Sequence, residues 1–143
     1  NQFSYIHFAT HGLFKPDSPL TSGLFLARDL ENDGLLSVGE LYSLRLNADL
    51  VTLSACETGL GKINNGDDLV GLSRGFLYAG SNTIMASLWK VDDRATSYLM
   101  TEFYKDLKKT NKRDALREAQ LATKKRYPHP FFWAAFQLTG MAD

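Results

Sequence analysis

The sequence is poor in cysteine and histidine, which limits the chemistry open to it. Among its 143 residues are one Cys and three His. A single cysteine excludes a disulfide within the chain and is ordinary in a reducing compartment. We therefore expect a cytoplasmic protein.

Long apolar runs and an excess of charge are also absent. The apolar stretches fall well short of the roughly 20 residues that span a bilayer, and the start lacks the pattern of a signal peptide. Sixteen basic residues balance sixteen acidic ones. Without a net field, neither nucleic acid nor a membrane is an expected partner.

The length predicts how the chain is organised. Single cores commonly take about 100–150 residues, so we expect residues 1–143 to form one domain. The chain begins at Asn1 inside an apolar run and without an initiator Met. This suggests a piece of a longer protein.

Short apolar runs alternate with amphipathic segments. We predict strands at Phe3–Thr10, Gly23–Ala27, Ala48–Ala55, Thr83–Val91 and Phe131–Thr139. A helix capped by Ser37, with Glu40 at the capping-box position, should end near Leu44. Further helices are predicted at Leu69–Ala79, Asp92–Lys109 and Arg113–Arg126, with a glycine-rich loop from Glu57 to Asp68. This order predicts an α/β fold with a mostly parallel sheet and helices on both faces.

Basic residues are frequent near the C-terminus. They are Lys105, Lys108, Lys109, Lys112, Arg113, Arg117, Lys124, Lys125 and Arg126. Such a set can form a docking face, but solvated helix surfaces commonly have this composition. We interpret these residues as a solvated face.

Two residues suited to acyl transfer stand at predicted strand ends. His11 ends the first strand, and Cys56 follows the strand Ala48–Ala55. Functional groups gather beyond the carboxyl ends of strands in open parallel sheets. An imidazole can take the proton of a thiol and later give it to a leaving amine, while the amides of Gly12 and Cys56 are candidate oxyanion donors. The alternative is a buried apolar cysteine and a hydrogen-bonded histidine.

Other site chemistries fit the sequence less well. The run from Cys56 to Lys62 resembles a phosphate loop, but Gly is missing at 56 and Ser or Thr at Ile63. His7 and His11 have the spacing of a zinc-binding helix, yet the segment lacks the intervening Glu and has the composition of a strand. No metal site is expected, and His7 is predicted to be a packed core residue.

Four motifs occur in order along the chain. They are HFATHG at 7–12, LSACETG at 53–59, LSRGFLYAG at 72–80 and ASLWKVDD at 86–93. Together they resemble the CHAT domain, a family of caspase-like cysteine peptidases related to separase and metacaspases. Its bacterial members commonly carry tetratricopeptide repeats upstream and act in signalling. The resemblance implies a caspase-like three-layer sandwich, of which this chain holds the portion from the His11 strand onward, with earlier strands and the repeats outside it.

The resemblance also implies roles for individual residues. His11 would be the general base and Cys56 the nucleophile of an endopeptidase that acts on protein substrates without a cofactor. The amides of Gly12 and Cys56 would form the oxyanion hole. A catalytically silent interaction module attached to the repeats is the alternative, and an acyl transfer to an amine would use the same thioester.

Acidic residues near these motifs are candidates for substrate binding. Asp92 and Asp93 follow a strand end where relatives place a carboxylate that recognises a basic residue, and Arg or Lys would suit it. Asp is also favoured at a helix start, which is the alternative for this pair. Glu57 lies beside Cys56 and could act on the same site, or be a solvated loop residue.

Overall fold

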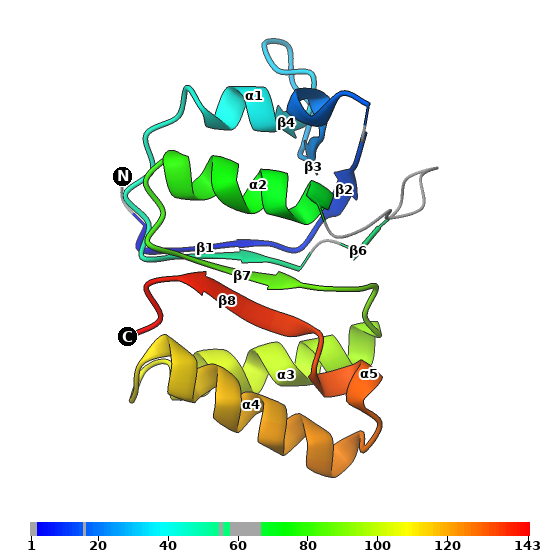
Figure 1. Ribbon diagram of the computed structural model, residues 1–143, viewed down its shortest axis with the longest axis vertical. Helices are drawn as coiled ribbons and strands as arrows, with labels where there is room; N and C mark the ends of the chain where they lie inside the picture. The colour runs from blue at the N-terminus through cyan, green and yellow to red at the C-terminus, as the bar shows by residue number, and fades with distance from the viewer. Residues whose placement is uncertain (1–2, 16, 55, 58–66) are drawn as a thin grey trace.

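A four-stranded sheet forms the centre of the fold (Figure 1). The computed structural model describes residues 3–15, 17–54, 56–57 and 67–143, without the side chains of 56–57 and 67–69. Strands β1, β5 and β7 are parallel, and β8 joins β7 antiparallel. In sheet order these strands are β1 (Tyr5–Phe8), β5 (Leu50–Leu53), β7 (Thr83–Ser87) and β8 (Phe136–Gly140).

Helices cover both faces of this sheet, so the fold has three layers (Figure 1). One face carries α1 (Val38–Leu41) and α2 (Asp67–Tyr78), and the other carries α3 (Asp93–Asp106), α4 (Lys112–Arg126) and α5 (Pro130–Trp133). Strand side chains alternate between two cores: Val51 packs on the α2 side and Leu50 on the α3 side. A strand buried on both faces reads as a continuous apolar run. The predicted α/β fold with a mostly parallel sheet is confirmed.

A second, mixed sheet lies at the carboxyl end of β1 and β5. Its strands, in order, are β4 (Leu35–Ser37), β3 (Gly23–Phe25), β2 (His11–Leu13) and β6 (Cys56–Glu57), with a short 3-10 helix η1 (Pro19–Thr21) before β3. Gly23 permits the close pairing of β3 with β4, because a Cβ there would lie 2.4 Å from the Leu36 carbonyl oxygen. The predicted loop after Cys56 lies largely in 58–66, outside the described residues.

The start of α1 follows the sequence pattern. The Ser37 hydroxyl accepts a hydrogen bond from the Glu40 amide at 3.2 Å, and the Glu40 carboxylate accepts one from the Ser37 amide at 2.8 Å. This reciprocal pair is the predicted capping box. The helix ends at Leu41 rather than at Leu44.

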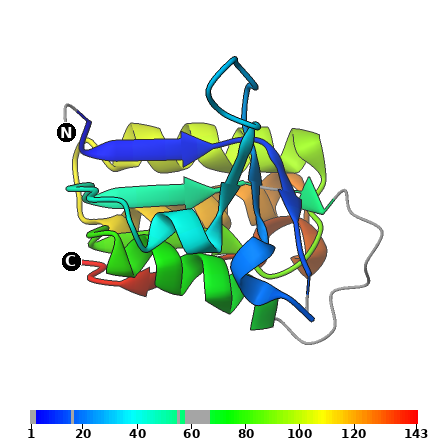
Figure 2. The same cartoon turned by 90° about the horizontal axis from the view of Figure 1, so that it is seen from above.

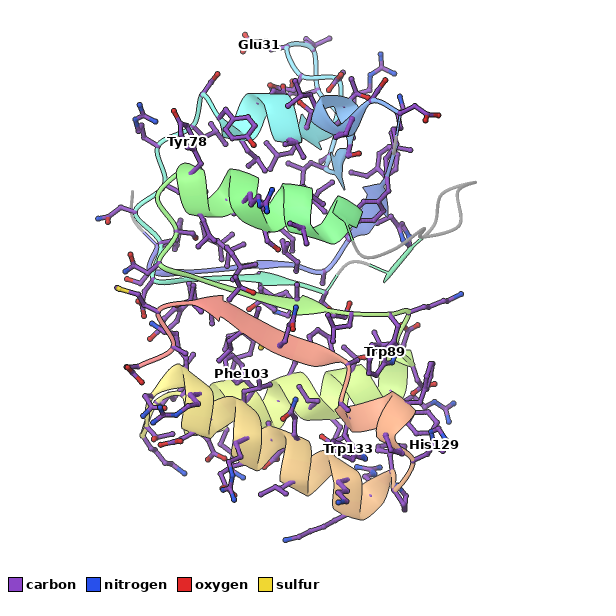
Figure 3. The ribbon with its side chains drawn as sticks, in the orientation of Figure 1. Glu31, Tyr78, Trp89, Phe103, His129 and Trp133 are labelled. Atoms are coloured by element: carbon purple, nitrogen blue, oxygen red, sulfur yellow. The ribbon has the colours of Figure 1, made fainter. Side chains whose placement is uncertain are left out.

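The predicted last strand is wrong in its first half. Phe131 belongs to α5, and β8 begins only at Phe136. Pro130 opens the helix with its fixed φ, and the His129 side chain accepts a hydrogen bond from the Phe131 amide at 3.2 Å. Figure 3 shows Trp89, His129 and Trp133 gathered around this short helix.

Lys112 does not lie on a solvated face, so that interpretation is wrong for this residue. Its side chain is only 6% exposed, and its ammonium group contacts the Asp49 carboxylate at 2.8 Å. The hydrogen bond from Lys112 lowers the pKa of Asp49 below its ordinary value of 3.8. The pair joins the start of α4 to the residue before β5.

Within the described part of the chain, no helix is long and apolar enough to cross a membrane.

We predict that Asp49→Asn lowers the free energy of unfolding by about 1–3 kcal/mol at pH 7, because it leaves the Lys112 ammonium without its charge partner. The cost stays below that of a fully buried pair, since the Asp49 side chain is 40% exposed. The folded-state pKa is lowered, so the contribution is present above about pH 4 and fades as the pH falls through that pKa. Urea unfolding at pH 7 and pH 3 measures both effects.

The control is Asp106→Asn, which removes the looser Lys109–Asp106 pair at 3.8 Å. Its Lys109 side chain is 67% exposed, so a change of about 0.5 kcal/mol or less is expected. Equal losses in both variants would contradict a special role for the Lys112 pair.

Candidate active site

The backbone places His11 and Cys56 side by side. β1 and β5 pair in parallel, with His7 opposite Thr52 and Phe8 opposite Leu53. Four residues further along each segment, His11 and Cys56 are themselves in register between β2 and β6. Neighbouring strands lie roughly 4.8 Å apart. The fold therefore brings the two sequence-predicted positions together, although the Cys56 side chain lies outside the described part.

His11 does not end the first strand as predicted. β1 stops at Phe8, and His11 is the first residue of β2. Between them the Thr10 hydroxyl donates a hydrogen bond to the Phe25 carbonyl at 2.5 Å, which ties the segment to β3. The contact lies at the point where the chain passes from β1 of the central sheet to β2 of the second sheet.

Gly12 is enclosed by strands on both sides. It is buried, and it is in register with Leu24 of β3 and with Glu57 of β6. A Cβ at this position would lie 2.9 Å from the Phe14 ring. A larger residue would therefore have to displace Phe14 next to the candidate dyad.

A hollow of about 920 Å³ lies in front of His11, between β1 and α3. β1 runs along one edge of the central sheet beside α3 (Figure 2). The imidazole of His11 is exposed. Its neighbours in the wall of this hollow include Ser54, Asp93, Ser97, Tyr104 and Lys108. The hollow has an acidic residue at the start of α3 and basic residues toward its end.

Asp92 and Asp93 have different surroundings. The Asp92 carboxylate caps α3 by accepting a hydrogen bond from the Ala95 amide at 2.9 Å. Asp93 is exposed and lines the hollow together with His11. Of the pair, Asp93 thus has the position of a substrate-binding residue, while Asp92 is occupied at the helix start. The side chain of Glu57, the third acidic candidate, lies outside the described part.

A hydrogen-bonded cluster in the same hollow was not foreseen. The Tyr104 hydroxyl donates to the Thr52 hydroxyl at 2.9 Å and lies 3.1 Å from Nδ1 of His7. Partial burial lowers the pKa of His7, and burial raises the pKa of Tyr104, although the hydrogen bond that Tyr104 makes with Thr52 opposes the latter shift. His7 was predicted to be a core residue, which is wrong: it is exposed on β1 and lines the hollow. Residues of α3 that face this hollow recur every three or four positions along the helix. This spacing in the sequence could have indicated that Tyr104 lies on the same face as Asp93.

Comparison with known proteins identifies the family. The CHAT domain model matches residues 1–141. The chain belongs to the CHAT domain family. The three-layer α/β arrangement agrees with the caspase-like fold that the resemblance implied for this domain.

Two tetratricopeptide repeat proteins are similar to this CHAT domain. Tetratricopeptide repeat protein 28 of Mus musculus is 37% identical over 109 residues, and that of Homo sapiens is 33% identical over 109 residues. The matches cover 74% of this chain but only 4% of each relative. Both relatives are mammalian proteins.

We predict that Asp92→Ala lowers the free energy of unfolding by about 1 kcal/mol, because the Ala95 amide loses its capping partner. Asp92→Asn should preserve stability, since asparagine caps equally well. Thermal unfolding of both variants measures this difference. A stable Asp92→Ala protein would show that the carboxylate is free for another role.

Proposed function

We propose that this CHAT domain is a cysteine endopeptidase in which His11 and Cys56 form the catalytic dyad. The observation that carries the proposal is the parallel register of His11 with Cys56 beside a hollow large enough for a peptide side chain. Membership of the CHAT family supports it. His11 is exposed to that hollow, as a group that exchanges protons with a substrate must be.

The chemistry proceeds through a thioester. His11 takes the thiol proton of Cys56, and the sulfur attacks the carbonyl carbon of the scissile peptide bond. The C–N bond then breaks, and the imidazolium returns the proton to the leaving amine. Water, deprotonated by His11, cleaves the thioester to release a carboxylic acid and restore the thiol. The Gly12 and Cys56 amides are the proposed donors to the oxyanion.

Asp93 is the proposed recognition residue for the side chain before the cut bond. α3 begins beyond the carboxyl end of β7, so Asp93 lies at the same edge of the sheet as His11, in the same hollow. A carboxylate there favours Lys or Arg through a charge-assisted hydrogen bond. Asp92 is unsuited to this role because it caps α3.

A second function has support from the relatives. Both similar proteins are named for tetratricopeptide repeats, and a silent CHAT domain joined to such repeats would serve in interaction or signalling. The two hydrophobic cores of the described residues do not include His11. For the endopeptidase, we propose a protein as the substrate. We also propose that the full-length chain carries tetratricopeptide repeats.

We predict that a peptide-based acyl probe labels Cys56 in the intact protein, with any activating partner present. His11→Ala should abolish labelling, because the thiol then lacks its base. Mass spectrometry of the labelled peptide identifies the site, and Cys56→Ala is the blank. His129→Ala is the matched control, since this exposed histidine caps α5 and is outside the hollow. Undiminished labelling of His11→Ala would contradict the dyad.

We also predict a preference for basic side chains that depends on Asp93. Probes with Lys before the reactive group should react faster than those with norleucine, and Asp93→Asn should reduce this ratio by about 10- to 100-fold, as expected for a lost charge-assisted hydrogen bond. The norleucine probe serves as the internal control. A ratio unchanged by Asp93→Asn would exclude this residue from recognition.

A further inference from the structure

Tyr104 contacts both strands that lead to the proposed dyad. Its hydroxyl lies 3.1 Å from Nδ1 of His7 on β1 and donates to the Thr52 hydroxyl on β5 at 2.9 Å. His7 and Thr52 are partners in the parallel register. The hydroxyl therefore links the two strands at one level of the sheet.

This level has a fixed relation to the dyad. His11 comes four residues after His7, and Cys56 comes four residues after Thr52. These later residues are again partners in register. A shift of β1 against β5 at His7 would thus be carried over a short segment to the spacing of His11 and Cys56.

The contact with Tyr104 adds to the backbone pairing of β1. Among the described residues, β1 pairs with β5, and β5 and β7 each pair with two strands. Tyr5, His7 and Ala9 on its α3-facing side are exposed. The Ser54 amide extends the pairing by donating to the Phe8 carbonyl at 3.0 Å. The Tyr104 contact adds a side-chain restraint from the helical layer to this backbone pairing.

The tyrosine is itself well anchored. Its ring packs edge-on against Phe103, which is fully buried, with 5.1 Å between ring centroids, and stands 5.7 Å from the His7 ring. Thr52 is completely buried, so its hydroxyl group needs a hydrogen-bond partner. Rigid support of this kind is what holds reacting groups in a productive geometry.

Tyr104 lies on the same face of α3 as Asp93, the proposed recognition residue. The two residues are eleven positions apart on α3, about three turns, so they share one face of the helix. Both line the hollow in front of His11. One side chain thereby connects β1, β5 and the helix whose first turn holds the proposed recognition residue.

The protonation states suit a positioning role rather than acid–base chemistry. Burial raises the pKa of Tyr104, which keeps the phenol protonated, and lowers the pKa of His7, which keeps the imidazole neutral. With its single proton donated to Thr52, the Tyr104 oxygen can accept a hydrogen bond from Nδ1–H of His7. The cluster is then satisfied without a net charge.

We propose that Tyr104 is a positioning residue for the His11–Cys56 dyad, acting through hydrogen bonds to His7 and Thr52 that fix β1 against β5. The inference rests on the proposed function. It adds to the dyad a group that acts through its hydrogen bonds to the two strands and that sets how the two catalytic residues meet.

The test uses Tyr104→Phe in the intact protein with the acyl probe. This variant keeps the ring contacts and removes only the hydroxyl. We expect the maximal labelling rate at saturating probe to fall about tenfold or more, with the half-saturating concentration unchanged within about twofold. Tyr98→Phe is the matched control on the same helix; its ring stacks on Arg126 outside the hollow, and its labelling should equal that of the wild type.

Two further substitutions separate positioning from general destabilisation. Thr52→Val should also slow labelling, and the double variant should be no slower than Tyr104→Phe, because that substitution already removes the hydrogen bond to Thr52. At exposed His7, His7→Asn keeps a donor near the Nδ1 position and should retain the rate within about threefold, whereas His7→Leu should lose it. Thermal unfolding gives the folded fraction by which each rate is corrected.

Each outcome is decisive. A corrected Tyr104→Phe rate equal to that of the wild type, or His7→Leu and His7→Asn behaving alike, overturns the positioning role while leaving the dyad standing. If Tyr104→Phe fails to fold, the His7 variants alone decide. Wild-type labelling that is absent or independent of His11 removes the proposed function, and the positioning role with it.

Discussion

The parallel pairing of β1 with β5 is the constraint on which the candidate site depends. β5 is buried on both faces, with Leu50 packed toward α3 and Val51 toward α2, so its position is set by two cores at once. β1 takes its register from this strand. Because the chain leaves both strands at the same edge, the register is passed on to β2 and β6, where His11 and Cys56 are partners.

α3 is the second element that shapes the site. Its residues cap the helix, line the hollow or pack in the core, depending on their position. Asp92 accepts a hydrogen bond from the Ala95 amide at the helix start, while the neighbouring Asp93 is exposed in the hollow. Leu99 and Phe103 anchor the opposite face in the core. The stripe that includes Asp93 and Tyr104 faces the hollow, and the ring of Tyr104 also packs against Phe103.

Periodicity and capping predicted the elements that local chemistry decides. The capping box at Ser37, the helix start at Asp92 and the apolar β5 all appear where the sequence placed them. The errors arise where distant contacts decide. The burial of Lys112 requires Asp49, and His7 is exposed in the hollow between β1 and α3, neither of which a local pattern reveals.

In the candidate site, too, some residues could be predicted from local motifs and others only from the folded structure. Motifs were sufficient to select His11 and Cys56 as positions, whereas the Tyr104 cluster depends on three elements meeting in space. This difference bears on the choice between a peptidase and a silent module. His11 is not part of either hydrophobic core, so core packing does not explain a base at this position. The proposed peptidase would account for His11 in register with Cys56 and for the exposed Asp93 in the same hollow.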